Sequence, residues 1–190
     1  MRAQVVLRPA LEADAPALVD VWTDVLRRAN REQQLEDVRQ VIDRVAVLPG
    51  ERLTVAEVDG EVVGAVHLRA TTISPINLDP VVQAISPHVL PDYRRHGIGT
   101  LLVEAAVAFA EELGINHVAT AVSAGARDSN RFMARLALGP AATLRVASVS
   151  AVKGRLHSQR PMLARAPVRG LPKVLAARRS MRQQGVTPRG

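Results

Sequence analysis

The hydrophobic positions of this chain follow two different periods, and these periods predict where helices and strands lie. Over residues 98–113 apolar side chains recur every three or four positions while glutamates occupy the other face, which predicts an amphipathic helix that ends at Gly114. The same period predicts helices over residues 14–26, 31–45 and 129–137. Runs rich in β-branched residues predict strands at residues 4–10, 52–58, 61–72, 81–90 and 117–122.

The order of these elements along the chain is β-α-α-β-β-β-α-β-α. It predicts a mixed α/β (α+β) fold, because a Rossmann-like domain would alternate strands and helices regularly. Asp59-Gly60 predicts a tight hairpin between the second and third strands. Pro87 lies inside the fourth strand, where it cannot donate a ladder hydrogen bond, and it indicates a sheet edge, a bulge or a splayed strand end.

The composition narrows the class of protein. A chain of 190 residues suits one domain, with room for a tail. The absence of cysteine excludes disulfides and thiolate metal sites and fits a reducing cytoplasm. Neither a signal-peptide pattern nor an apolar run near membrane-spanning length is found, so we expect a cytoplasmic protein without membrane contact.

Charge is distributed unevenly along the chain. Residues 1–128 carry 12 basic and 18 acidic side chains, whereas residues 129–190 carry 13 basic and no acidic ones. A basic segment of this kind either binds nucleic acid or is a solvated tail. Phe132 is the only aromatic residue in that segment, so base stacking has little support and nucleic acid is the less favoured partner.

The stretch "DYRRHGIGTLL" carries the clearest chemical signal. Gly97 and Gly99 lie at the start of the helix predicted over residues 98–113, where the backbone N–H groups are unpaired and the helix dipole is positive. Glycines there let an anion approach the backbone, and the preceding Arg94, Arg95 and His96 add positive potential. The pattern indicates a phosphorylated ligand, a pyrophosphate in particular, although neither a P-loop nor a Rossmann motif is present.

The stretch "VLPDYRRHGIGTLLVEAAVAFAEELGI" resembles the central motif of the GCN5-related N-acetyltransferases (GNAT), [Q/R]-x-x-G-x-[G/A], which lies between the fourth strand and third helix of that family. The segment "ARDSNRFMARLALGP" is similar to the family's asparagine-bearing helix. The resemblance implies a GNAT-like domain over residues 1–150, with a mostly antiparallel sheet that splays at its fourth strand and flanking helices. Residues 151–190 then form a basic C-terminal extension.

The resemblance also implies a site for acetyl-CoA in the wedge beside the fourth strand. Its pantetheine arm would be lined by Pro87, His88 and Val89, and its pyrophosphate would be wrapped by Arg95, His96, Gly97, Ile98, Gly99 and Thr100, with Arg94 in the motif's first position. Asn130 matches the family's asparagine, and it either contacts the cofactor or caps a helix N-terminus.

The sequence departs from the family at the proton donor. Many members carry a tyrosine in the last helix that protonates the departing thiolate, whereas Met133 or Ala137 falls near that position here. Asp79 and His88 are the candidate general bases, ahead of His67. The histidines lack the spacing of metal ligands, so no metal is expected.

Two classes of function follow. The first is an acetyl-CoA-dependent N-acetyltransferase in which a primary amine, on a small molecule or a peptide, attacks directly in a ternary complex. The second is a catalytically inactive acyl-CoA-binding or regulatory module whose basic tail contacts a partner or nucleic acid. A homodimer is expected through apolar residues of the tail, which include Leu156, Met162 and Leu163, and a short helix is expected over residues 173–184.

Overall fold

The structure is a computed structural model that describes residues 4–122 and 125–159. Its contacts cluster into two compact units, Met1–Gly139 and Pro140–Gly190. The predicted division after residue 150 falls inside the only element of the second unit within the described residues, helix α5 (Val149–Gln159). The helix expected over residues 173–184 lies outside the described residues, as do Met162 and Leu163.

The first unit is built on one five-stranded sheet in the order β1-β2-β3-β4-β5. Strands β1 to β4 pair antiparallel with their neighbours, and β5 pairs parallel to β4, so the predicted mixed and mostly antiparallel sheet is confirmed. The strands are β1 (Val5–Pro9), β2 (Glu51–Val58), β3 (Glu61–Thr72), β4 (Pro80–Val89) and β5 (Val118–Thr120).

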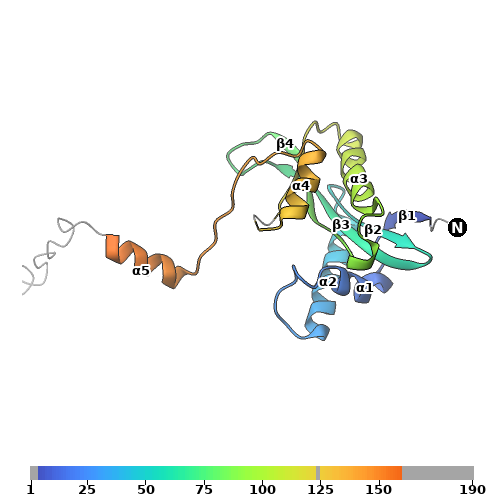
Figure 1. The fold of residues 1–190 in the computed structure, drawn as a ribbon, viewed down its shortest axis with the longest axis horizontal. Helices are drawn as coiled ribbons and strands as arrows, with labels where there is room; N and C mark the ends of the chain where they lie inside the picture. The colour runs from blue at the N-terminus through green and yellow to red at the C-terminus, as the bar shows by residue number, and fades with distance from the viewer. Residues whose placement is uncertain (1–3, 123–124, 160–190) are drawn as a thin grey trace, which may run out of the picture. The chain divides into compact units, whose positions relative to one another are not determined.

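Helices cover both faces of this sheet (Figure 1). α1 (Ala15–Val21) and α2 (Arg31–Val47) pack on one face, and α3 (Ile98–Glu112) packs on the other. α4 (Arg127–Arg135) follows β5, and two short 3₁₀ turns precede α1 and α3, at Glu12–Asp14 and Pro91–Tyr93. Each face therefore has a hydrophobic cluster of its own, and the α3 cluster is centred on Phe109 and Leu102.

Local sequence signals explain the ends of these elements. Asn30 caps α2, because its side-chain oxygen accepts from the Gln33 amide at 2.8 Å and the Gln33 side chain returns to the Asn30 amide. Asp59 and Gly60 both have positive φ, as a type I′ hairpin requires. Gly114 has φ +66° directly after α3 and ends it as predicted.

The structure also differs from the sequence pattern. The pattern of α1 extends to residue 26, yet the helix ends at Val21, and Val25 is exposed in the following turn. Residues 140–148 form no regular element, so the family's last hairpin is not found in the part of the chain that is described. The α5 helix was not expected from the sequence.

The fourth strand carries the irregularity that Pro87 indicated. Ala65 of β3 pairs with His88 and His67 pairs with Ile85, so Ser86 and Pro87 together oppose one β3 residue. This is a β-bulge, and Ser86 has a left-handed φ of +48°. β5 pairs only with Val82–Ala84, so the β5-facing edge of β4 is unpaired from Ile85 onward among the described residues. The bulge and the early end of β5 together make the splay.

Candidate cofactor-binding site

The loop between β4 and α3 is a concave array of backbone N–H groups. Arg95 and Gly97 have positive φ, of +65° and +84°, and Gly97 is the N-cap of α3. Within the described part of the chain, the backbone N–H groups of residues 95–99 have no hydrogen-bond acceptor, whereas Thr100 already donates to the Gly97 carbonyl at 2.9 Å. Successive free donors at a positive helix end are typical of anion-binding nests, and we call residues 95–99 the nest.

The two glycines of the motif have different surroundings. A Cβ placed on Gly97 would meet nothing within 4 Å, so the space above this residue is open to a ligand. A Cβ on Gly99 would lie 3.4 Å from the ring of Phe132, so the missing side chain there brings α4 against the start of α3. Gly97 therefore keeps the nest accessible, and Gly99 lets the two helices meet.

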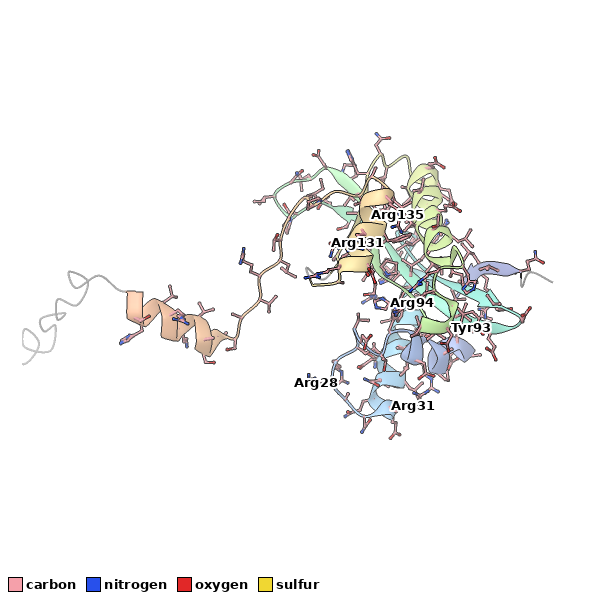
Figure 2. All side chains as sticks on the ribbon, viewed as in Figure 1. Arg28, Arg31, Tyr93, Arg94, Arg131 and Arg135 are labelled. Atoms are coloured by element: carbon pink, nitrogen blue, oxygen red, sulfur yellow. The ribbon has the colours of Figure 1, made fainter. Side chains whose placement is uncertain are left out.

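Arg94 fixes the loop to the end of β4. Its Nε donates to the Val89 carbonyl at 3.0 Å, which ties the start of the loop to the strand that would carry the cofactor. Figure 2 shows Arg94 on the loop that leads into α3, and Arg131 and Arg135 on α4. Arg95 and His96 are exposed on the same loop, so the guanidinium groups of Arg94 and Arg95 add positive charge beside the nest.

The C-terminal half of β4, beyond its pairing with β5, carries polar groups that a ligand could contact. Thr120 of β5 donates through Oγ1 to the Ala84 carbonyl at 2.8 Å, which satisfies the last carbonyl before the splay. Beyond it, His88 is half-buried, and its buried Nδ1 has no hydrogen-bond partner among the described residues. An unpartnered buried nitrogen costs about 1–3 kcal/mol unless a ligand satisfies it, which fits a site that takes a polar molecule.

The structure separates the two candidate bases. His88 pairs with Ala65, whose side chain belongs to the α1/α2 cluster, so His88 lies on that face of the sheet. Asp79 is exposed before β4 begins, in a turn where its amide contacts the Asn77 side chain. Asp79 and His88 are nine positions apart along extended chain, roughly 25–30 Å at the rise of a β-strand. The two side chains are not brought together.

His67, the lesser candidate, is buried on the same face as His88. Its Nε2 lies 2.7 Å from the Glu51 carboxylate, and Arg44 and Arg69 contact the same carboxylate. Burial lowers the pKa of His67, against the opposing effect of Glu51. The histidine is therefore already partnered within the domain.

Neither Met133 nor Ala137, the two positions expected for the proton donor, carries a side chain that can donate a proton. Met133 is buried, and Ala137 lies just after the helix with φ +61°. Asn130 is not the N-cap, which is Ala126; its Nδ2 instead donates to the Ala126 carbonyl at 2.9 Å. Tyr93 packs against the α3 cluster, and its hydroxyl donates to the Glu61 carboxylate at 3.3 Å, so its contacts are structural ones.

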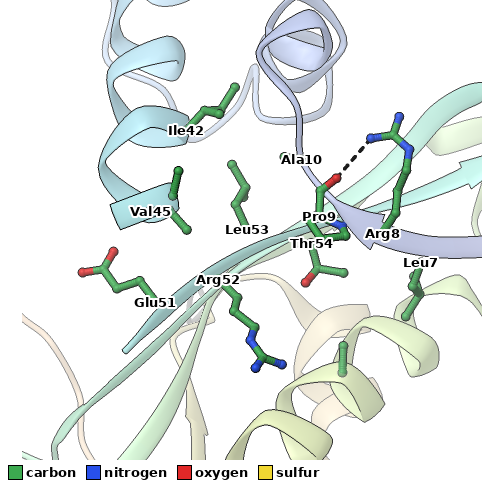
Figure 3. Close-up of a pocket in the computed structure, with 12 residues that line it drawn as sticks. Leu7, Arg8, Pro9, Ala10, Ile42, Val45, Glu51, Arg52, Leu53 and Thr54 are labelled. Atoms are coloured by element: carbon green, nitrogen blue, oxygen red, sulfur yellow. Dashed lines mark hydrogen bonds between the residues drawn. The ribbon is translucent and has the colours of Figure 1, made fainter. Parts of the chain in front are cut away.

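A cavity of about 430 Å³ lies at the opposite edge of the sheet, between the end of α2 and α3 (Figure 3). It opens where β1 ends beside the first residues of β2. Its charged side chains already have partners: Arg8 contacts Asp14, Arg52 contacts Glu112, and Glu51 contacts His67. The cavity is distinct from the nest and the β4 bulge.

Two residues that position the site were not expected from the sequence. A Cβ on Gly64 would lie only 3.0 Å from the His88 carbonyl, so this glycine lets β3, β4 and α3 meet. Trp22 donates from Nε1 to the Ser86 carbonyl at 2.9 Å and holds the bulge from the α1 side. Neither contact has a local signature, because each joins segments far apart in the sequence.

Comparisons with known proteins place the chain in a family. Residues 16–138 match the model of the Acetyltransferase (GNAT) family, and the chain belongs to that family. No curated protein sequence matches the chain closely enough to be reported.

Solved structures share the fold. A transcriptional regulator from Bacillus halodurans C-125 superposes with a TM-score of 0.67 at 22% identity, over 76% of this chain and 99% of that one. The aminoglycoside antibiotic 6′-N-acetyltransferase AAC(6′)-Ih from Acinetobacter baumannii gives 0.62 at 18% identity, over 76% and 97%. AAC(6′)-Iy in complex with the bisubstrate analog CoA-S-monomethyl-acetylneamine gives 0.63 at 15% identity, over 77% and 98%.

Within residues 4–122 and 125–159, no three histidine or acidic side chains gather so that they could hold a metal ion. Over the same residues, no helix has both the length and the apolar character to cross a membrane.

Proposed function

We propose that this protein is an acetyl-CoA-dependent N-acetyltransferase that transfers an acetyl group to a primary amine, on a small molecule or a peptide. The observation that carries the proposal is the nest of five free N–H groups at residues 95–99, which adjoins the unpaired edge of β4. A diphosphate fits the nest, and an extended amide-bearing arm fits the open strand edge.

In this proposal acetyl-CoA supplies the thioester carbonyl that is attacked. The protein holds acetyl-CoA in place and supplies a general base. Arg95 to Thr100 hold the diphosphate, Arg94 fixes the loop, and the backbone of Pro87 and Val89 holds the arm. Asn130, on α4 beside the start of α3, contacts the donor from the other side of the nest. That Asn130 contact stays a prediction.

His88 is the base that we favour over Asp79, because it lies at the bulge while Asp79 lies at the far end of β4. Its Nδ1 accepts the proton that the amine loses as the nitrogen attacks the carbonyl carbon and the carbon–sulfur bond breaks. The thiolate then takes a proton from solvent, since neither Met133 nor Ala137 can donate one. Direct attack of this kind needs no covalent enzyme intermediate.

The first experiment is a calorimetric titration of acetyl-CoA and CoA into the wild-type protein and into Gly97→Glu. Wild-type binding in the micromolar range is expected, with no detectable binding by Gly97→Glu, because a carboxylate would face the diphosphate. Gly60→Glu is the matched control, since Gly60 also has a left-handed φ, of +86°, and a Cβ there also meets nothing within 4 Å among the described residues. Retained affinity in a folded Gly97→Glu protein would overturn the assignment of the diphosphate site.

The missing proton donor supports one alternative, an inactive acyl-CoA-binding or regulatory module. A screen of amines with the thiol product as readout separates the two functions. Turnover that falls about 10²-fold or more in His88→Ala, with CoA affinity kept, supports the enzyme. Tight CoA binding without turnover on any amine supports the module.

A further inference from the structure

A long-range side-chain hydrogen bond from Trp22 holds the β4 bulge. Trp22 is the only tryptophan of the chain and is 6% exposed at the end of α1. Its indole Nε1 donates to the Ser86 carbonyl at 2.9 Å, across 64 positions of sequence. The contact joins the α1/α2 face of the sheet to the strand that splays.

Ser86 needs this support. Its φ of +48° is left-handed, a conformation that costs a non-glycine residue free energy. The following residue, Pro87, has no N–H to donate to β3, so the ladder cannot hold this part of β4. The Trp22 hydrogen bond gives the Ser86 carbonyl a donor from outside the sheet ladder.

Trp22 also anchors the segment that follows α1. Its own carbonyl accepts from the amides of Val25 and Leu26, at 2.9 and 3.0 Å. The residue therefore sits between the α1–α2 connection on one side and the bulge on the other. Its position is set by the α1 core, where Leu18 and Ala15 are completely buried.

We infer that Trp22 is a positioning residue for donor binding: its indole N–H holds Ser86 in the left-handed conformation and so places Pro87, His88 and Val89 for the acyl-CoA arm. This inference rests on the proposed function. Trp22, at the end of α1, then has two roles: it packs in the hydrophobic core, and it positions the cofactor site.

The test compares Trp22→Phe with Leu18→Val by CoA calorimetry and thermal unfolding. Trp22→Phe keeps an aromatic ring and loses the donor, and we expect CoA affinity to fall about three- to tenfold, the size of one hydrogen bond. Leu18→Val removes a methylene group from the same cluster without touching β4, so the melting temperature should fall while CoA affinity stays the same. Equal affinities for the two variants would overturn the inference.

A rescue variant separates positioning from packing. Ser86→Gly removes the cost of the left-handed conformation, so the double variant Trp22→Phe/Ser86→Gly should recover most of the lost affinity without recovering the melting temperature. If Trp22 only fills the core, Ser86→Gly will leave the affinity of Trp22→Phe unchanged. That outcome counts against the inference.

Hydrogen exchange in the absence of CoA distinguishes this inference from the proposed function. Trp22→Phe should speed exchange at the amides of His88 and Val89 more than at Val81 and Val82, which lie before the bulge. If the wild-type protein binds no CoA, the proposed function fails, and this comparison alone decides whether Trp22 holds the bulge. Uniform exchange along β4 in the variant would show that it does not.

Discussion

Asp14 shows how one residue can connect three segments of the fold. It is 8% exposed, and its carboxylate accepts from both Nη1 and Nη2 of Arg8 and from the Leu11 amide. The hydrogen bonds from Arg8 lower the pKa of Asp14. Arg8 in turn contacts Glu57, so the start of α1 is tied to β1 and β2.

We expect Asp14→Asn to lower the free energy of unfolding by about 2–3 kcal/mol at pH 7, because it leaves Arg8 half-buried with one ionic partner fewer. A carboxylate with a lowered pKa stabilises the fold above its unfolded value of 3.8 and loses that effect as the pH falls through the folded value. The difference between the variant and the wild type should therefore shrink below pH 4. Urea unfolding at pH 7 and pH 3 measures it.

Asp20→Asn is the control for this prediction. Asp20 pairs with Arg31 in the same part of the fold, but both side chains are 56% exposed. Its replacement should change stability little at either pH. Equal losses for the two variants at pH 7 would mean that burial of the Asp14 carboxylate is irrelevant.

His67 also makes the fold less stable in acid, but in a pH range closer to neutrality than that of Asp14. Burial is the largest effect on this histidine and lowers its pKa below 6.5, despite Glu51 at 2.7 Å and with Arg44 and Arg69 nearby. The unfolded chain then binds the proton more readily than the folded one. The contribution of His67 to the free energy of unfolding is therefore fully present above about pH 6.5 and decreases as the pH falls below that value.

His67→Gln should remove this component of the pH dependence, because the amide can still donate to Glu51 but cannot titrate. The measurement is the melting temperature of the wild type and the variant between pH 7.5 and 5.5. Exposed His117→Gln should retain the wild-type slope. If the melting temperature of His67→Gln changes with pH as steeply as that of the wild type, a group other than His67 causes the pH dependence.

At the scale of elements, the junction of β3, β4 and α3 depends on Gly64. A Cβ there would lie 3.0 Å from the His88 carbonyl, 3.3 Å from Ile98 Cγ2 and 3.4 Å from Val89 Cγ2. Gly64→Ala should cost about 1–3 kcal/mol of stability and weaken CoA binding, since the displaced atoms line the proposed site.

Chemical unfolding and CoA calorimetry of Gly64→Ala test this junction. Gly139→Ala is the control, because its Cβ would meet nothing within 4 Å and no change is expected. Should Gly64→Ala bind CoA like the wild type, the spacing between β3 and β4 does not control the site.

The sequence predicts the elements well where the signal is local. Asn30 caps α2, Asp59-Gly60 makes the hairpin, and Gly114 ends α3, because each acts through its own backbone or that of close neighbours. Pro87 likewise indicates an edge, a bulge or a splayed end in the fourth strand, because it cannot donate in any register, and the structure shows a bulge. These signals and the apolar periods are sufficient for the order of strands and helices.

The contacts that the sequence does not predict join distant segments. Trp22 reads as one apolar residue in a helical stripe, and its bond to Ser86 depends on how α1 packs on the sheet. Asp79 and His88 are equally plausible bases until the register of β4 places them at opposite ends. α5 was missed because its first turn has no acidic residue and Gly154 interrupts its pattern, although Ser148 acts as an N-cap by accepting from the Ala151 amide at 3.2 Å.

At the scale of the whole molecule, the two units differ in charge and in the chemistry they carry. Residues 1–139 hold 14 basic and all 18 acidic side chains, while residues 140–190 hold 11 basic and none that are acidic. The sheet, the nest and the bulge all belong to the first unit. A protein truncated after Gly139 should therefore keep the CoA affinity of the full chain, and calorimetry of both proteins checks this.

We expect the second unit to determine the oligomeric state of the protein, through helix α5. α5 has 11 residues, and isolated helices of that length are marginal in water without a packing partner. Val149, Val152 and Leu156 lie three and four positions apart on α5 and are 70%, 45% and 59% exposed. A stripe of this kind is buried when two copies of the helix associate.

We therefore predict that the full chain is a homodimer and that Leu156→Glu is a monomer, because a carboxylate in the stripe would be buried without a partner. Light scattering after size-exclusion chromatography measures both masses across the micromolar range. Ala151→Glu, which also places a carboxylate on α5 but on the side of the helix opposite the stripe, should remain dimeric. A monomeric wild type throughout that range would remove the dimer and leave the apolar face of α5 to another partner.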